Sequence, residues 1–341
     1  QANEVLVKVG AAGICASDHH IINGTATWPL PIVLGHEGAG TIIKVGKNVT
    51  RVKPNDRCIL SFISNCGYCR PCLTGNPQLC DTHSLAPTKL FDGKVRLNDG
   101  NTGIDQMHKL GVFSEFAVVP EQACYPIPDT IPMHVGALIG CCVTTGTGGI
   151  INNPASRPGM TVAVFGCGGV GLSVIQGARL MNASRIIAVD IHNHKLEFTY
   201  KFGATDIINA READPVEKIK DLTSGGVDMA IDSFGNATTS SNAVKSLRKA
   251  GTAIMIGLGA VGETAPVDMV DMVRGQKTLA GSYYGSASPH ETFRKLIDLH
   301  LRGQLDVESL ITRTYNLDNI NAGFDAITRG EDGRGVIIFG K

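Results

Sequence analysis

Apolar runs recur through the middle of the chain, and stretches with a helical pattern separate them. The runs TVAVFG (161–166) and RIIAVD (185–190) are rich in β-branched residues, and the helix-like stretch LSVIQGARLM lies between them. Continuous apolar runs of this length are typical of strands buried on both faces of a parallel sheet. Three more such runs occupy 226–232, 252–257 and 277–282. Because strands alternate with helices, residues 143–284 are predicted to form an α/β domain with a doubly wound parallel sheet.

The pattern changes on either side of this region. Before it, EVLVKV (4–9) alternates between apolar and polar positions, and GAGTIIKVG (38–46) has a β pattern. Residues 1–142 are therefore predicted to form a largely β domain. After it, PHETFRKLIDLHLRG (289–303) has an amphipathic helical pattern that begins near a proline and stops at a glycine. We expect the segment 285–341 to return to the first domain and complete it.

Composition narrows the class of protein. Of 341 residues, 43% are hydrophobic and 18% are charged, which suits a folded globular chain and excludes disorder. Lysine plus arginine equals aspartate plus glutamate, so the charge gives no indication of a nucleic-acid partner. No apolar run approaches the ~18 residues that a membrane helix requires, so no membrane association is predicted. Without a visible secretory signal, the chain is predicted to be cytoplasmic.

Four of the ten cysteines lie in one loop, CGYCRPCLTGNPQLC (66–80). In a long chain that is predicted to be cytoplasmic, such a cluster indicates a bound metal rather than disulfides. Four thiolates close a tetrahedral zinc shell and leave no position for water, so this metal is predicted to be structural. An iron–sulfur cluster uses the same donors, and four unliganded thiols would be an oxidation liability. The predicted ligands are Cys66, Cys69, Cys72 and Cys80.

A glycine-rich turn, GCGGVG (166–171), follows the first apolar run. The strand, the turn, the helix, the second strand and its terminal Asp190 form the pattern of a dinucleotide-binding Rossmann unit. In this pattern Gly166 forms the tight turn, Gly168 lets the backbone approach the pyrophosphate, and Gly171 allows close packing of helix and strand. A carboxylate at Asp190 binds ribose hydroxyls and repels a 2′-phosphate, so NAD is predicted rather than NADP. The predicted NAD-binding residues here are Gly166, Gly168, Gly169, Val170, Gly171, Asp190 and Lys195.

Three further fragments contain residue types that bind metals: GICASDHH (13–20), GHEGAG (35–40) and LIGCCVTTG (138–146). Cys15, His36 and Cys141 supply two sulfurs and one nitrogen, which is the donor set of a catalytic zinc site with an open fourth position. They lie far apart in the sequence, so spacing alone does not join them. Taken singly, each is better explained as a packed core residue.

These fragments, the four-cysteine loop and the glycine-rich turn together resemble the zinc-dependent medium-chain alcohol dehydrogenases, over nearly the whole chain. The matching motifs are GIC-x-SD-x-H, GHEGAG, LIGC-x-x-x-TG and GCGGVG with its following acid. The resemblance implies a GroES-like catalytic domain beside the Rossmann domain, with Cys15, His36 and Cys141 as ligands of a catalytic zinc. It also implies that Glu37 approaches this metal during ligand exchange and that Asp18 orients the ligating histidine.

Two doubled residues make the register of these motifs ambiguous. The register from LIG selects Cys141 over Cys142, and the register of S-D-x-H selects His20 over His19 as the base of a proton relay. In this relay Ser17 accepts the proton of the alcohol and passes it through the nicotinamide ribose to His20. An unperturbed histidine pKa of about 6.5 suits proton transfer near neutral pH.

The resemblance also assigns residues outside the metal sites. Phe62 and Trp28 are expected beside the substrate, and Arg334 is expected at the pyrophosphate of the cofactor. Ala16 occupies a position where family members often carry a basic residue or histidine, so weaker NAD binding is expected. The Gly-, Asn- and Asp-rich stretch 81–111 is expected to form a surface lobe that screens the substrate. Such a lobe goes with homodimers more than with homotetramers.

The predicted activity follows from these sites. The chain is predicted to be an enzyme with two zinc ions that transfers a hydride between a small primary or secondary alcohol and NAD, giving an aldehyde or ketone. One alternative is a dehydrogenase for the S-hydroxymethyl adduct of formaldehyde with a small thiol. A quinone or enoyl reductase needs no zinc, and the cysteine motifs argue against it. The alternative from another class is a non-catalytic NAD-binding zinc protein.

Overall fold

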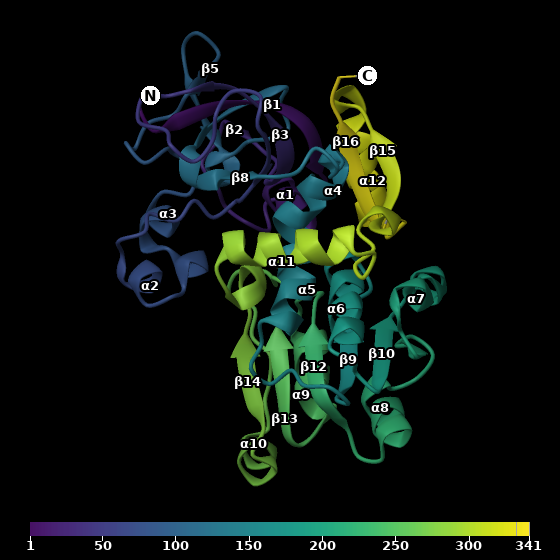
Figure 1. Cartoon of the computed structure of the whole chain (residues 1–341). Coiled ribbons are helices and arrows are strands. Elements are labelled where there is room, and N and C mark those ends of the chain that lie inside the picture. Colours follow the sequence, from purple (N-terminus) through teal and green to yellow (C-terminus); the bar gives the residue numbers. More distant parts are fainter. Residues whose placement is uncertain (332, 341) are drawn as a thin grey trace. The chain divides into compact units, whose positions relative to one another are not determined.

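The computed structural model describes residues 1–331 and 333–340, and the chain forms two compact units (Figure 1). The first unit contains Gln1–Thr144, Ala287–Gly303 and the chain from Val307 onward. The second contains Thr145–Ser286 and Gln304–Asp306. The first unit is therefore discontinuous in sequence, because the second is inserted into it.

A six-stranded parallel sheet forms the centre of the second unit. Its strands are β9 (Thr161–Phe165), β10 (Arg185–Asp190), β11 (Asp206–Asn209), β12 (Val227–Asp232), β13 (Leu247–Met255) and β14 (Thr278–Gly281). Their order in space is β11-β10-β9-β12-β13-β14, so the connections run first to one side of β9 and then to the other. Ligands of such sheets bind where the order reverses, beyond the carboxyl ends of the strands. The predicted doubly wound parallel sheet is confirmed.

Helices connect these strands and cover the sheet. They are α5 (Thr144–Ile151), α6 (Gly169–Leu180), α7 (Asn193–Thr199), α8 (Pro215–Thr223), α9 (Ala237–Lys245) and α10 (Met269–Gly275). Ala163, Ile187 and Ala230 belong to the apolar core of this unit and have no exposed surface. Strand β11 is not predicted by the sequence pattern, because an apolar run this short resembles a loop.

A seven-stranded, mainly antiparallel sheet organises the first unit. Its strands are β1 (Glu4–Gly13), β3 (Glu37–Val45), β4 (Arg57–Leu60), β7 (Phe116–Pro120), β8 (Cys124–Pro126), β15 (Ile311–Tyr315) and β16 (Arg334–Ile338). Strand β1 pairs with β3, β7 and β16, so the last strand of the sequence lies against the first. Along the first half of β1 the side chains alternate in burial, as predicted for EVLVKV. A small second sheet joins β2 (Ile32–Val33), β5 (Leu97–Asn98) and β6 (Gly103–Gln106).

The helices of the first unit are short, apart from α11 and α12. They are α1 (Ala16–Ile22), α2 (Arg70–Leu73), α3 (Asp81–Leu85), α4 (Met133–Leu138), α11 (Pro289–Leu301) and α12 (Ile320–Arg329). Single 3₁₀ turns occur at Pro77–Leu79, Glu121–Ala123, Glu308–Leu310 and Leu317–Asn319, and at Tyr200–Phe202 in the second unit. Met107–Lys109 and Tyr284–Ser286 form turns that contain left-handed residues. Helix α11 begins at Pro289, and Gly303 just beyond its end has a φ of +68°. The helix predicted for this stretch is confirmed.

One helical run is longer and more apolar than the sequence analysis predicts. Within residues 1–331 and 333–340, Met133–Ile151 is long and apolar enough to cross a membrane by length and composition, so the prediction that no such run exists is wrong. Helix α4, a π-helical turn (Ile139–Val143) and α5 form this run without a break. In its most apolar window 83% is buried inside the protein, as in the core helix of a globular domain.

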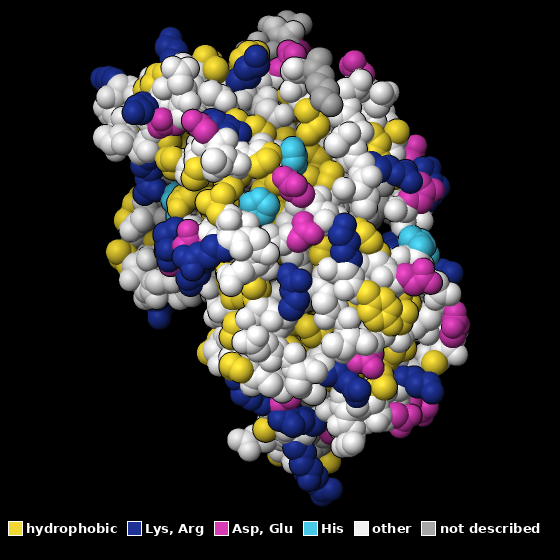
Figure 2. Space-filling view, turned by 45° about the vertical axis from the view of Figure 1, so that its right-hand side comes forward, with side chains coloured by type: hydrophobic (Ala, Val, Ile, Leu, Met, Phe, Trp, Pro, Cys, Tyr) yellow, Lys and Arg dark blue, Asp and Glu magenta, His cyan; other side chains and the backbone are white. Residues whose placement is uncertain are grey.

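Charged side chains of both signs are mixed over the surface in view in Figure 2. Lys and Arg lie beside Asp and Glu there, with apolar side chains between them. This distribution agrees with the formal net charge of zero. A surface with mixed charges does not produce the single-sign field that attracts polyanions.

Candidate functional site

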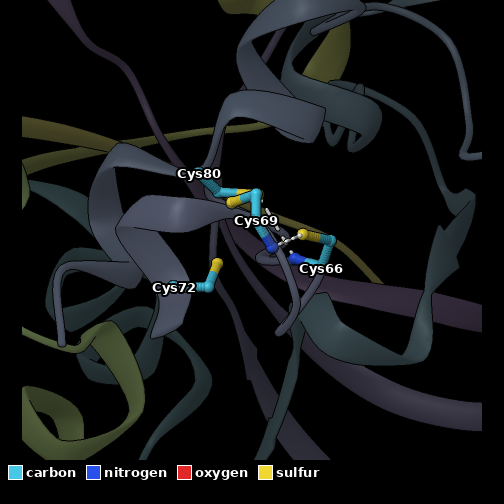
Figure 3. A group of neighbouring side chains, drawn as sticks. All are labelled: Cys66, Cys69, Cys72 and Cys80. Atoms are coloured by element: carbon cyan, nitrogen blue, oxygen red, sulfur yellow. Dashed lines mark hydrogen bonds between the residues drawn. The ribbon is translucent and has the colours of Figure 1, made fainter. Parts of the chain in front are cut away.

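The four cysteines of the 66–80 loop surround one small space (Figure 3). Their sulfur atoms all lie within 4.8 Å of one another. Cys69 precedes the single turn of α2, Cys72 lies within that turn, and Cys80 precedes α3. Backbone N–H groups also point at the sulfurs: that of Cys66 donates to Cys80 at 3.2 Å, and that of Cys69 donates to Cys66 at 3.4 Å. Two short helices and their preceding residues thus hold the thiols in place.

This arrangement has the dimensions of a tetrahedral metal site. Four sulfurs about 2.3 Å from a central zinc would lie about 3.8 Å apart, and the Sγ atoms of Cys69 and Cys80 are 3.9 Å apart. All ten cysteines are free thiols, so no disulfide competes for these sulfurs. Burial would raise the pKa of Cys66, but hydrogen bonds from Thr82 and from neighbouring backbone N–H groups lower it to about 6. The loop therefore stabilises a thiolate at Cys66, the form that binds metal, whereas burial raises the pKa of Cys72 and Cys80.

A second group of donors converges inside the first unit. The ligand atoms of Cys15, His36, Glu37 and Cys141 lie within 4.8 Å of one another, and all four side chains are buried. Cys15 lies just beyond β1, and His36 immediately precedes β3; the two strands pair with Gly13 opposite Glu37. Cys141 lies in the π-helical turn after α4. The sheet register, rather than sequence spacing, brings these residues together.

Electrostatics within this group favours a thiolate beside a charged or metal-bound imidazole. A hydrogen bond with Cys141 is the main reason that the pKa of Cys15 is well below its usual value, and burial opposes this shift. Burial lowers the pKa of His36, but the negative charges of Asp18 and Cys15 outweigh it, and the net shift is upward. Buried negative charge requires a cation nearby. Two thiols and an imidazole are donors that zinc prefers.

Asp18 holds the ring of His36 in one orientation. Its Oδ1 accepts hydrogen bonds from the backbone N–H of Gly35 at 2.8 Å and from Nδ1 of His36 at 3.3 Å. The carboxylate is fully buried in α1. Because Nδ1 is engaged, Nε2 is the nitrogen of His36 that faces the thiol of Cys15.

Glu37 forms a buried ion pair with Arg334, which lies at the start of β16. Burial raises the pKa of Glu37 to about 7, and the charge of Arg334 opposes this shift. The pairing of β16 with β1 brings the arginine to the donor group. The sequence patterns predict a pyrophosphate contact for Arg334 and do not predict this ion pair, which depends on the strand order.

The two adjacent cysteines have different surroundings. The thiol of Cys142 donates to the backbone carbonyl of Leu138 at 3.7 Å, inside the helical run, and is fully buried. Consecutive residues of a helix point about 100° apart. Cys141 therefore faces His36 while its neighbour packs within the helix, and the geometry selects Cys141 for the donor group.

Helix α1 carries the residues predicted for the proton relay. The Oγ of Ser17 lies 3.8 Å from the Sγ of Cys15. His19 and His20 both lie in the last turn and are half-buried. Nε2 of His19 is 3.5 Å from the hydroxyl of Thr328 in α12. The structure thus places Ser17 beside the donor group, and the relay itself stays a prediction.

The glycine-rich turn joins β9 to α6 where the strand order reverses. Gly166 has a φ of +92°, a conformation that favours glycine. A Cβ at Gly171 would overlap the carbonyl oxygen of Gly166, so this glycine allows the helix to approach the strand. A Cβ at Gly168 would have no described atom within 4 Å beyond its chain neighbours, and Gly169 and Val170 follow it in the first turn of α6. Packing does not require glycine at 168, and open backbone at a helix N-terminus fits a bound phosphate.

Asp190 is the last residue of β10, and its carboxylate is hydrogen-bonded to the glycine-rich turn. Oδ2 accepts from the backbone N–H of Cys167 at 2.8 Å, and Oδ1 accepts from the N–H groups of the next two residues at 2.7 and 3.1 Å. Nδ1 of His192 lies 3.2 Å from the same oxygen. Lys195 is half-buried in α7, which follows this strand. The acid therefore lies where the dinucleotide pattern requires it.

Aromatic rings form a wall beside the second donor group. The ring of Phe62 lies edge-on to His36, with ring centroids 5.5 Å apart. The ring centroid of His108 is 5.0 Å from that of Phe62, 5.8 Å from that of His36 and 5.1 Å from that of Trp28. The two predicted substrate residues, Phe62 and Trp28, thus belong to one cluster that His108 joins. The sequence does not single out His108, because no motif surrounds it.

Comparisons with known proteins agree with this geometry. The family model of the alcohol dehydrogenase GroES-like domain matches residues 1–129, and that of the zinc-binding dehydrogenase matches residues 169–302. The chain is 37% identical to S-(hydroxymethyl)glutathione dehydrogenase of Saccharomyces cerevisiae over 348 residues, which cover 99% of this chain and 90% of that protein. It is similar to the structure of benzyl alcohol dehydrogenase from Acinetobacter calcoaceticus, with a TM-score of 0.91, 33% identity, and 100% of this chain and 93% of that chain covered. An alcohol dehydrogenase zinc-binding domain protein from Burkholderia ambifaria gives a TM-score of 0.94 and 31% identity with the same coverage.

Proposed function

Because the chain belongs to the zinc-dependent medium-chain alcohol dehydrogenase family, we propose that it transfers a hydride between a primary or secondary alcohol and NAD, forming an aldehyde or a ketone. The observation that carries the proposal is the convergence of Cys15, His36 and Cys141 on one buried point. Two sulfurs and one nitrogen leave a fourth tetrahedral position for a substrate oxygen. The four-cysteine loop offers four sulfurs and leaves no such position, so its metal would be structural.

The residues around this point have distinct tasks. Cys15, His36 and Cys141 would hold a zinc ion, whose positive charge would lower the pKa of an alcohol hydroxyl, as zinc lowers the pKa of bound water to about 7 in favourable sites. Asp18 fixes the His36 ring through Nδ1 and so directs Nε2 to the metal. Glu37 offers a further carboxylate oxygen for ligand exchange, and its ion pair keeps that charge balanced in the interior.

Ser17 and His20 move the proton of the alcohol out of the site. The hydroxyl of Ser17 lies beside the sulfur of Cys15 and accepts the proton. His20, which is one helical turn away and part-exposed, would then receive the proton. His19 is the weaker candidate because its Nε2 faces the hydroxyl of Thr328.

The second unit would bind NAD, and the first would carry the chemistry, in line with the predicted domains 1–142, 143–284 and 285–341. The open backbone at Gly168 and the N-terminus of α6 suit the pyrophosphate. The carboxylate of Asp190 suits ribose hydroxyls, and it would repel a 2′-phosphate at close range, which favours NAD. Roles for Lys195 at the ribose and for Arg334 at the pyrophosphate stay predictions.

A metal and activity assay on two adjacent cysteine variants tests the proposal. We expect the wild-type protein to contain two zinc ions per chain and to form NADH with at least one of a set of short, long and aromatic alcohols. Cys141→Ser should lose one zinc and turnover, whereas the matched control Cys142→Ser should keep both, because Cys142 lies outside the donor group. Full activity in Cys141→Ser, or no NADH from any alcohol, would overturn the proposal.

The second candidate reaction is the oxidation of an S-hydroxymethyl thiol adduct. The observation that favours it is the 37% identity to the yeast S-(hydroxymethyl)glutathione dehydrogenase. NADH formation from formaldehyde that requires added glutathione would support this reaction, and equal rates without the thiol would exclude it. A protein that holds zinc and NADH but turns over neither substrate would be the non-catalytic alternative. The homodimer and the cytoplasmic location stay predictions.

A further inference from the structure

Two histidines connect the four-cysteine loop to the aromatic wall. His83 lies in α3, just after that loop, and His108 lies in the turn Met107–Lys109. Nε2 of His83 and Nδ1 of His108 are 3.4 Å apart. The two rings are 7° from coplanar with centroids 5.7 Å apart, so the facing nitrogens lie between the ring centres and point toward each other. The proposed chemistry uses neither histidine.

The hydrogen bonds fix where each ring carries its proton. The backbone N–H of Ser64 donates to Nδ1 of His83 at 3.3 Å, so this nitrogen is unprotonated. The proton of His83 therefore resides on Nε2, which donates it to Nδ1 of His108. Nδ1 of His108 is then also an acceptor, which leaves its proton on Nε2. Burial lowers the pKa of His83 to about 3, in agreement with a neutral ring at this position.

Nε2 of His108 is consequently a hydrogen-bond donor for which residues 1–331 and 333–340 offer no acceptor. Within the part of the chain that the structure describes, the bond to His83 is the only hydrogen bond of this side chain. The ring is half-buried, and its other ring neighbours are Trp28, Phe62 and His36. Because Nδ1 faces His83, Nε2 is directed away from it. A donor among aromatic rings is costly unless a ligand or water accepts its bond.

The backbone holds this ring in a rare conformation. His108 and Lys109 have φ values of +54° and +63°, in the left-handed region that non-glycine residues seldom adopt. Nε2 of the Gln106 side chain donates to the carbonyl of Leu110 at 3.0 Å, and Nζ of Lys109 donates to the carbonyl of Ala86. Such conformations persist where the surrounding structure over-determines them, and they cluster at ligand sites. The bracing of this turn therefore points to a requirement for the position of His108.

We propose that His108 determines substrate specificity, by donating a hydrogen bond from Nε2 to a second oxygen of the alcohol, distinct from the reacting hydroxyl. The preferred substrates are then alcohols that carry an ether, hydroxyl or carbonyl oxygen near the reacting carbon. His83 is the positioning residue, since its Nε2–H selects the tautomer of His108. This inference rests on the proposed dehydrogenase function and narrows its substrate class.

A matched pair of alcohols tests the donor. 2-Methoxyethanol and 1-butanol have the same chain length and differ by one ether oxygen in place of a methylene group. We expect His108→Leu to lower the ratio of kcat/KM for 2-methoxyethanol to kcat/KM for 1-butanol by about tenfold, the effect of one hydrogen bond. His108→Gln, whose amide offers a donor of similar reach, should restore part of the ratio. The two alcohols differ in intrinsic reactivity, but this difference is the same for every variant. It therefore cancels when the ratios of kcat/KM are compared between proteins.

The outcomes separate this inference from the function on which it rests. Equal ratios in wild type and both variants, with 1-butanol still oxidised, would overturn the role of His108 and leave the dehydrogenase function intact. No NADH from these two alcohols or from any of the other short, long and aromatic alcohols with the wild type would overturn both. A readout that does not depend on activity is the nitrogen-15 spectrum of labelled histidines, with the His108 signals assigned from the His108→Gln protein. A proton on Nε2 of His108 supports the inference, and a proton on Nδ1 overturns it even where His108→Leu fails to fold.

Discussion

Gly168 and Gly171 occupy the same turn but meet different surroundings, so replacing each with alanine separates cofactor binding from folding. A Cβ at Gly171 would overlap the carbonyl oxygen of Gly166 and lie 2.9 Å from the hydroxyl of Ser233. Backbone atoms cannot move aside as the end of a side chain can. We therefore expect Gly171→Ala to lower the free energy of unfolding by about 1–3 kcal/mol, the usual range for overpacking. For a unit of this size, the Tm would fall by about 2–12 °C.

Gly168→Ala should leave the fold almost unchanged. Gly168 has a φ of −78°, which any residue adopts, and its Cβ would have no described atom within 4 Å beyond its chain neighbours. Alanine is a slightly poorer helix N-cap than glycine but lowers the entropy of the unfolded chain, and these effects of a few tenths of a kcal/mol to about 1 kcal/mol largely cancel. The methyl group would instead occupy the space that the pyrophosphate approaches. We expect the Kd for NADH to rise by about tenfold or more, which corresponds to about 1.4 kcal/mol.

Two measurements on the same samples check this contrast. Fluorescence titration gives the Kd for NADH, and thermal unfolding without cofactor gives the Tm. A Gly168→Ala protein that is stable and binds NADH like the wild type would refute the assignment of the turn to the pyrophosphate. An unchanged Tm in Gly171→Ala would refute the packing argument.

Three further changes test other parts of the protein. Asp190→Asn keeps an acceptor for the N–H of Cys167 but removes the charge, so the ratio of kcat/KM for NADP to that for NAD should rise by about tenfold; steady-state kinetics that show an unchanged ratio would exclude Asp190 as the discriminator. Ser17→Ala should lower kcat by about a hundredfold and affect the Kd for NADH far less; near-normal turnover would remove Ser17 from the relay. Burial, assisted by Arg51, lowers the pKa of His290 to about 4, whereas the unfolded chain has a pKa of about 6.5. The contribution of neutral His290 to stability is therefore complete above pH 6.5 and is lost as the pH falls toward 4, so the Tm of His290→Gln should decline less than that of the wild type between these values. Parallel Tm curves for the two proteins would contradict this reasoning.

Local signals in the sequence predict the second unit and the four-cysteine loop well. Strands β9, β10 and β12 consist mainly of buried β-branched and other apolar residues, and the glycine-rich turn follows the first of them directly. The loop cysteines lie within fifteen residues of one another, so their convergence needs little chain closure. The sequence pattern does not identify the long apolar helical run Met133–Ile151, because glycines, threonines and cysteines interrupt its larger apolar residues.

The remaining contacts depend on pairings between distant segments. Cys15 and Cys141 are separated by more than a hundred residues, and only family resemblance joins them before the fold is known. The ion pair of Glu37 with Arg334 requires β16 to lie beside β1, which no sequence pattern states. His108 reaches the aromatic wall through a left-handed turn that its residue types disfavour.

The interrupted course of the first unit has a consequence for synthesis on the ribosome. Every proposed metal ligand has left the ribosome once Cys141 has emerged, and all strands of the second unit follow before β16 is made. Until β16 arrives, the Ala11–Gly13 edge of β1 lacks its partner strand and Glu37 lacks its counter-ion. A nascent chain in this state exposes an unpaired strand edge that can recruit other chains. Release of the C-terminal strand is therefore the event that both seals the sheet and neutralises the buried acid.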